Sequence, residues 1–135
     1  MNNKSFTLAE IIIVVVIIGI MASFAIPGYQ RTIERAHLSD ARNNLLAIHA
    51  AEQAYFLEQQ GFWPADGNAY ATNDINTILH LSIIENGVGY KCAQGILVGQ
   101  TYVCEAQRST SSGFTMRATE QPISATNPQC TINCP

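Results

Sequence analysis

The sequence is poor in charged residues and has no excess of positive charge. Charged side chains make up 13% of the 135 residues, about half of the quarter that is usual in soluble proteins. Seven Lys and Arg stand against ten Asp and Glu. A general nucleic-acid-binding protein normally carries a basic face, so we expect no nucleic acid as a general partner.

The motifs of common enzymes are also missing. The chain has no nucleophile motif, no glycine-rich phosphate loop and no pair of carboxylates in a recognisable frame. His37 and His49 are about three helical turns apart and His80 lies further along, so we interpret all three as solvated helix histidines. The sequence therefore predicts a protein that is not an enzyme and has no cofactor.

A long uncharged run near the N-terminus is the strongest signal in the chain. Seven Ile, three Val and one Phe lie between Ile11 and Ile26, where no residue carries a charge. A helix from Phe6 to Gln30 would be about 37 Å long, which exceeds the ~30 Å hydrocarbon core of a bilayer. A lone span must be helical, because lipid offers its backbone no hydrogen bonds. Residues 6–30 are therefore predicted to form a membrane helix, with a Sec signal peptide or a plain anchor as the alternatives.

Glu10 stands alone at the start of this helix. No cation lies in the same helical turn, and a lone carboxylate in lipid is costly. If the chain is cut before Phe6, the new α-amine lies about one helical turn from Glu10 and can pair with it within one copy or between copies. The alternative is an acid at the headgroups that interacts with the positive end of the helix dipole.

The residues around this acid resemble a known leader. Residues 4–10 read KSFTLAE and are followed at once by the Ile- and Val-rich run. This combination resembles the class III leader of type IV pilins and type II secretion pseudopilins. The resemblance implies that a prepilin peptidase removes residues 1–5, that Phe6 is N-methylated and that Glu10 docks one subunit on another. The family has Gly before the cut where this chain has Ser5, so we expect slower cleavage between Ser5 and Phe6.

The resemblance also implies a location and partners. The subunit would first lie in the bacterial inner membrane, in contact with lipid, crossing it once with its N-terminus in the cytoplasm. An assembly platform protein and a cytoplasmic ATPase would then drive identical subunits into a helical surface filament, whose core is the bundled N-terminal helices. In the family, the stretch that matches Gly19 to Pro27 often loses helix inside filaments, and Pro27 itself removes a helical hydrogen bond.

Charge returns after the membrane segment, and an apolar stripe begins. Apolar residues recur at steps of three or four, which predicts an amphipathic helix over residues 31–60 that ends at Gly61. Residues 31–135 would form the globular domain, which is too small to bury the first half of so long a helix. The stripe consists of Leu38, Ala41, Leu45, Ile48, Ala51 and Tyr55, widened by Ala47, Ala50 and Ala54.

The rest of the chain predicts a small sheet. Residues 61–89 are loop-like, with one short helix over residues 73–79 and with Trp63 in the seam between helix and sheet. Alternation at period two predicts antiparallel strands within residues 90–120. Residues 121–135 have no period and are predicted to form an irregular flap. The fold class is therefore α+β, a long N-terminal helix packed by its second half against an antiparallel sheet of about three to four strands.

Four cysteines lie in the predicted sheet and flap. With the N-terminus in the cytoplasm all four face the exterior, where disulfides persist. Three pairings are possible, and we favour Cys92–Cys104, which are in phase on neighbouring strands, together with Cys130–Cys134. The main competitor ties down the flap through a 104–130 or a 92–130 bond. The spacings match no strong zinc motif, so we expect no metal.

The sequence as a whole predicts a structural subunit of a type IV pilus. It would polymerise through its N-terminal helix into a surface filament that serves adhesion, motility or DNA uptake. The alternative is a type II secretion pseudopilin in a short periplasmic filament. The major pseudopilin carries an acidic calcium loop near its end, whereas residues 121–135 contain no Asp or Glu. A second alternative is a monomeric, membrane-anchored binding module.

Overall fold

The chain forms two helices and five strands within the residues that the structure describes, in the order α1, β1, α2, β2, β3, β4, β5. It divides into two compact units, Met1–Glu34 and Arg35–Pro135. The computed structural model describes residues 7–95, 101–110, 113–121 and 127–134, without the side chain of Pro27.

Helix α1 extends from Leu8 to Gln59 and passes through Pro27 without ending. Proline has no backbone N–H, so one hydrogen bond of the preceding turn is missing at this point. One turn further along, the Thr32 hydroxyl donates a hydrogen bond to the carbonyl of Gly28 at 3.0 Å. The long helix therefore agrees with the sequence prediction, and Pro27 lies inside it rather than at its end.

The first half of α1 exposes its apolar side chains. An 18-residue window has a mean hydropathy of 2.8 and none of it is buried, so this helix is long and apolar enough to cross a membrane. Each large apolar residue between Leu8 and Ile26 exposes 47% to 80% of its surface. These residues are Leu8, Ile11, Ile12, Ile13, Val14, Val15, Val16, Ile17, Ile18, Ile20, Met21, Phe24 and Ile26.

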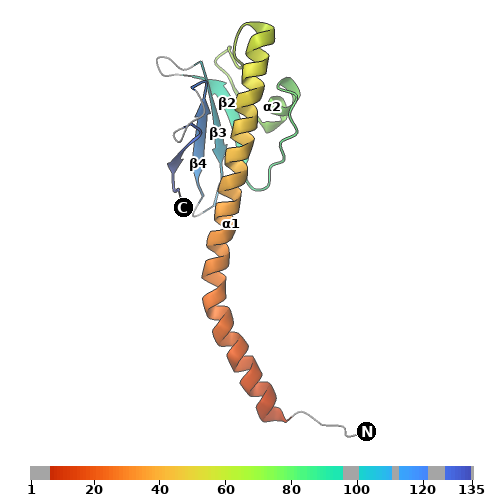
Figure 1. Ribbon diagram of the computed structural model, residues 1–135, viewed down its shortest axis with the longest axis vertical. Coiled ribbons are helices and arrows are strands. Elements are labelled where there is room, and N and C mark those ends of the chain that lie inside the picture. The colour runs from red at the N-terminus through yellow and green to blue at the C-terminus, as the bar shows by residue number, and fades with distance from the viewer. Residues whose placement is uncertain (1–6, 96–100, 111–112, 122–126, 135) are drawn as a thin grey trace, which may run out of the picture. The chain divides into compact units, whose positions relative to one another are not determined.

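The five strands form one antiparallel sheet in which neighbours in the chain are neighbours in space. Strands β2, β3 and β4 are its centre, and in Figure 1 the second half of α1 runs along the sheet beside β2 and β3. The strand bounds are β1 Ala69–Ala71, β2 Gly89–Gln94, β3 Tyr102–Gln107, β4 Thr115–Thr119 and β5 Gln129–Ile132.

The predicted strand count of three to four is wrong, because β1 and β5 also belong to the sheet. Strand β1 lies in residues 61–89, which were predicted to be loop-like, and β5 lies in the predicted flap of residues 121–135. These edge strands have three and four residues. Such short segments show no alternation, and only backbone pairing with β2 and β4 defines them.

Two helix ends also differ from the prediction. Helix α1 is terminated by Gln60, which has a left-handed φ of 59° and donates its N–H to the Phe56 carbonyl at 2.9 Å. The predicted terminator, Gly61, lies one residue too late. Helix α2 covers Thr72–Ile78, one residue earlier than the predicted 73–79.

The core joins α1 to one face of the sheet, as predicted. The stripe residues Ala41, Leu45 and Ile48 are fully buried, and Leu38, Ala51 and Tyr55 pack against the same cluster. The sheet contributes Tyr90 and Cys92 of β2, then Tyr102, Cys104 and Ala106 of β3, and then Met116 and Ala118 of β4 with Phe114 just before it. The prediction that three further alanines widen the stripe is wrong, since Ala47, Ala50 and Ala54 are all exposed. His49 and Glu52 lie in the buried face instead.

Both disulfides join residues that are close in sequence. Cys92 and Cys104 lie directly opposite each other on β2 and β3, with their Cα atoms 4.1 Å apart. Cys130 and Cys134 close a short loop at the end of β5, with their Cα atoms 6.0 Å apart. This is the pairing that the sequence favours, and neither bond ties the last residues to the central strands.

The packing of α1 on the sheet predicts the effect of shortening one core side chain. Leu45→Ala removes a fully buried side chain and should lower the free energy of unfolding by about 2–5 kcal/mol. The control is Leu57→Ala on the same helix, where the leucine is 74% exposed and the expected change is within about 0.5 kcal/mol. Denaturant unfolding of the full chain in detergent micelles measures both. Equal effects of the two variants would contradict this packing.

Candidate functional site

The described part of the N-terminus is organised by a reciprocal pair of hydrogen bonds. Thr7 precedes α1, and Glu10 lies in its first turn. The Glu10 Oε2 atom accepts the backbone N–H of Thr7 at 2.8 Å and the Thr7 hydroxyl at 2.7 Å. The Thr7 Oγ1 atom in turn accepts the N–H of Glu10 at 3.3 Å. This arrangement is a capping box, which partners helix-end N–H groups that would otherwise remain free.

The capping box changes the interpretation of Glu10. The sequence indicates a carboxylate without a partner, whereas the structure gives it one within its own chain. The missed signal is the spacing of Thr7 and Glu10, since Thr followed three residues later by Glu before an apolar run is a helix-start motif. Both of these bonds go to Oε2, and a carboxylate can accept further donors at its other oxygen.

The other predicted residues of this site are placed only in part. The cleavage and methylation positions, Ser5 and Phe6, lie outside the described residues. Gly19 lies inside α1, and a side chain at its position would meet nothing within 4 Å. Pro27 also lies inside α1, so both predicted weak points of the helix are helical in this chain.

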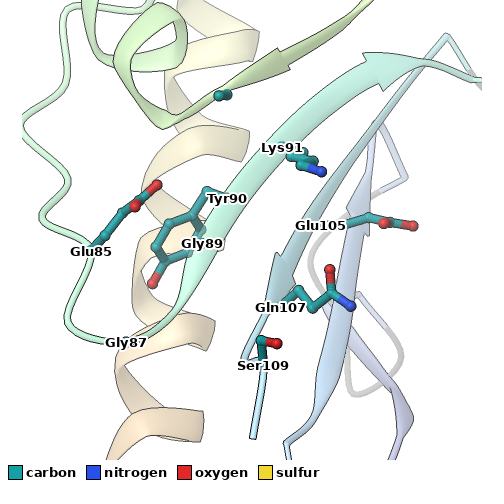
Figure 2. Close-up of a pocket in the computed structure, with 9 residues that line it drawn as sticks. Glu85, Gly87, Gly89, Tyr90, Lys91, Glu105, Gln107 and Ser109 are labelled. Carbon is teal, nitrogen blue, oxygen red and sulfur yellow. The ribbon is translucent and has the colours of Figure 1, made fainter.

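A hollow lies at the outer side of the sheet, beside β2 and β3, and several of the residues that line it are polar. It has a volume of about 270 Å³, and Figure 2 shows Lys91 on β2 and Glu105 and Gln107 on β3 around it. Lys91, Glu105 and Arg117 are successive cross-strand neighbours, and Glu105 forms an ion pair with Arg117. Such pairing of opposite charges is what a solvated sheet face shows. We therefore assign no ligand to this hollow.

A second group of polar side chains is buried between α1 and the sheet. His49 is only 7% exposed, which contradicts the prediction that it is solvated. Its Nδ1 atom lies 2.8 Å from the Tyr102 hydroxyl and 3.0 Å from the Thr119 carbonyl. Burial, together with the negative charges of Glu52 and Glu120, raises the pKa of the Tyr102 phenol well above its usual range. The burial of His49 was not predicted, because a single histidine in a helix does not reveal whether it lies on the buried or the exposed face.

Glu52 is the most deeply buried ionisable side chain of this group. It is 0% exposed, and its Oε2 atom accepts the backbone N–H of Trp63 at 3.0 Å. Burial raises the pKa of the Glu52 carboxyl to about 7, although the hydrogen bond from Trp63 favours the ionised form. Its place could have been read from the sequence, because Glu52 follows Leu45 and Ile48 at helical spacing on the core stripe.

Metal binding has no support in the described ranges. Within residues 7–95, 101–110, 113–121 and 127–134, no three His, Cys, Asp or Glu side chains gather in a way that could hold a metal ion. All four cysteines are in disulfides. The N-terminal capping box and the cluster around Glu52 remain as candidate polar sites.

Comparison with known proteins identifies the N-terminal segment. Residues 1–26 match the family described as the prokaryotic N-terminal methylation motif. Over this segment, the chain resembles the type IV pilin family. The capping box and the exposed apolar residues from Leu8 to Ile26 thus lie within the segment that matches the methylation motif.

Curated relatives point to the same family. The chain is 40% identical over 78 residues to the type IV major pilin protein PilA of Myxococcus xanthus, covering 51% of this chain and 36% of that protein. It is 42% identical over 67 residues to the fimbrial protein EcpC of Eikenella corrodens, covering 50% and 43%. It is 35% identical over 90 residues to the type IV major pilin protein PilE of Neisseria gonorrhoeae, covering 64% and 53%. The chain thus spans about half the length of these relatives or less. No solved structure matches the chain significantly.

The capping box predicts the effect of removing the Thr7 hydroxyl. Thr7→Val keeps the shape of the side chain but removes the cap, at a cost of about 1 kcal/mol to the first turn of α1. Hydrogen exchange of the full chain in detergent micelles should then show about fivefold lower protection at the amides of Glu10 and Ile11, which bond to Thr7. Thr32→Val is the control, because the Thr32 hydroxyl bonds only to the carbonyl of Gly28 inside the helix. Unchanged protection in Thr7→Val would argue against a cap.

Proposed function

We propose that this chain is a structural subunit of a type IV pilus, which polymerises through the first half of α1 into a helical filament. The exposed apolar surface between Leu8 and Ile26 carries this proposal. Apolar area in contact with water costs about 25 cal/mol per Å², so this surface needs lipid or other apolar helices around it. The bacterial inner membrane would cover it before assembly, with the N-terminus in the cytoplasm, and sister helices would cover it afterwards.

Glu10 would give the assembly its register. Helices in lipid have no hydrophobic drive to associate, so polar pairs and close packing select their contacts. The second oxygen of Glu10 is open to the amine that cleavage before Phe6 would create on a neighbouring copy. The capping box holds the carboxylate near the first turn of the helix, which presents it to that amine.

Processing and filament extension follow from the same segment. A prepilin peptidase would cut between Ser5 and Phe6, with N-methylation of Phe6, and a platform protein with its ATPase would draw the subunit from the membrane. Between Gly19 and Pro27 the helix would open inside the filament, because Pro27 has already removed one hydrogen bond there. The globular unit would then face the exterior and serve adhesion, motility or DNA uptake.

The names of the relatives favour a pilus over a secretion filament. PilA and PilE are called type IV major pilins and EcpC a fimbrial protein. The absence of Asp and Glu from residues 121–135 agrees with this choice, since the calcium loop of a major pseudopilin is acidic.

Replacement of Glu10 tests the proposal. Glu10→Ala should insert into the inner membrane at the wild-type level but form no surface filaments, because the docking partner of the next amine is lost. Glu58→Ala is the control, since Glu58 is an exposed glutamate near the other end of α1 and should leave assembly intact. Electron microscopy of sheared surface material counts the filaments, and mass spectrometry of their subunits identifies the first residue.

Two outcomes would contradict this proposal. Filaments at wild-type abundance in the Glu10→Ala strain would remove the docking role. A wild-type chain that remains monomeric in the membrane of a piliated host would favour a membrane-anchored binding module instead.

A further inference from the structure

Glu52 joins α1 to the segment that follows it. The side chain is 0% exposed, and its Oε2 atom accepts the Trp63 backbone N–H at 3.0 Å. Its Oε1 atom is also buried and has no hydrogen-bond partner among the described residues. One N–H group is thus the only donor that the described structure offers to a fully buried carboxyl group.

The neighbours of Glu52 do not supply a compensating positive charge. On α1, His49 lies one turn earlier, and its Nδ1 atom is engaged by Tyr102 and Thr119. From the sheet, the Tyr102 phenol on β3 and the Glu120 carboxylate after β4 face the same region, since the charges of Glu52 and Glu120 both act on Tyr102. No Lys or Arg forms an ion pair with Glu52 within the described ranges.

The segment that Glu52 holds is itself part of the core. The Trp63 side chain is 8% exposed, and its ring packs on Tyr70 of β1 with a centroid distance of 4.9 Å. Phe62 stacks on Phe56 of α1 with a centroid distance of 4.6 Å. Movement of residues 62–64 away from α1 would break the Phe62–Phe56 contact and the Trp63–Glu52 hydrogen bond and let water reach the Glu52 carboxyl.

We propose that Glu52 is a proton-operated latch between α1 and residues 62–64. When Glu52 is protonated, the latch is closed, because a neutral carboxyl group with one hydrogen bond is tolerated in this buried interface. When it loses its proton, the buried charge has one donor and no cation, so residues 62–64 open more often and hydrate it. This goes beyond the proposed function, because it holds for the globular unit whether or not the chain polymerises.

The direction of the pH effect follows from linkage. The Glu52 pKa is raised from 4.5 to about 7 in the closed state, so that state binds the proton more tightly than an open state with an ordinary carboxyl. The contribution of Glu52 to closure is complete below about pH 4.5, and it is lost as the pH rises to about 7. If the open state has the ordinary pKa, the opening constant rises by up to about 300-fold across this window and is level above it.

Hydrogen exchange at the Trp63 amide tests the latch directly. Trp63 is the sole tryptophan, so its backbone amide is readily assigned in the full chain in detergent micelles. After correction for the intrinsic exchange rate, its protection should fall steeply between pH 5 and 7 and level off near pH 8. The Ile48 amide, inside the buried part of α1, should show no such fall, because the opening is local.

Three variants identify the titrating group. Glu52→Gln keeps the shape and cannot ionise, so the protection of Trp63 should become independent of pH. Glu58→Gln removes an exposed carboxylate two turns along the same helix and should behave as wild type. His49→Gln should also keep the wild-type profile. A profile that survives in Glu52→Gln, or that is lost in His49→Gln, would overturn the proposal.

A measurement on the unmodified chain applies even if Glu52→Gln does not fold. Carbon-13 NMR of glutamate carboxyls should show one group that titrates near pH 7, with the same midpoint as the fall in Trp63 protection. If all glutamates titrate below about pH 5.5, near their ordinary range, or if Trp63 protection does not change with pH, there is no latch.

Discussion

The apolar surface of the first half of α1 is exposed among the described residues, and this constraint governs the interpretation of the rest of the molecule. Thirteen large apolar side chains between Leu8 and Ile26 remain at least 47% exposed. The core of the remaining chain is already formed by the later stripe of α1 and one face of the sheet. A molecule with such a surface depends on its surroundings, first a bilayer and then, in the proposed filament, other copies of itself.

Polar groups at the start of this apolar helix find hydrogen-bond partners within the same few residues. The capping box gives the Glu10 carboxylate and the N–H groups of Thr7 and Glu10 partners from only four consecutive residues, 7–10. A subunit in the membrane therefore need not carry a carboxylate without any hydrogen bond. What the cap leaves open is one carboxylate oxygen, so that local satisfaction and docking to a second copy are compatible roles for the same side chain.

Almost throughout the globular unit, apolar side chains are buried and charged side chains are exposed or paired. Glu52 is the exception. Alternate residues of the central strands face the core, two disulfides close short loops, and oppositely charged residues pair on the outer face. Glu52 is instead a fully buried acid on the core stripe, without a cation among the described residues. Natural proteins place switches and functional sites at exceptions of this kind. For this reason we assign Glu52 a role in pH-dependent opening rather than in stability.

The sequence by itself determined the long helix, the exposed apolar half, the inward faces of the three central strands and the in-phase position of Cys92 and Cys104. These features repeat with the period of a helix or a strand, and the spacing alone therefore reveals them. The spacing also contained the capping box of Thr7 and Glu10 and the inward place of Glu52, although both were overlooked. Only the tertiary structure decided that β1 and β5 are strands, that His49 is buried, and that the Glu52 carboxyl meets the Trp63 N–H. Each of these depends on a contact between segments that are distant in the chain or separated by a turn, and such contacts leave no periodic pattern in the residues that make them.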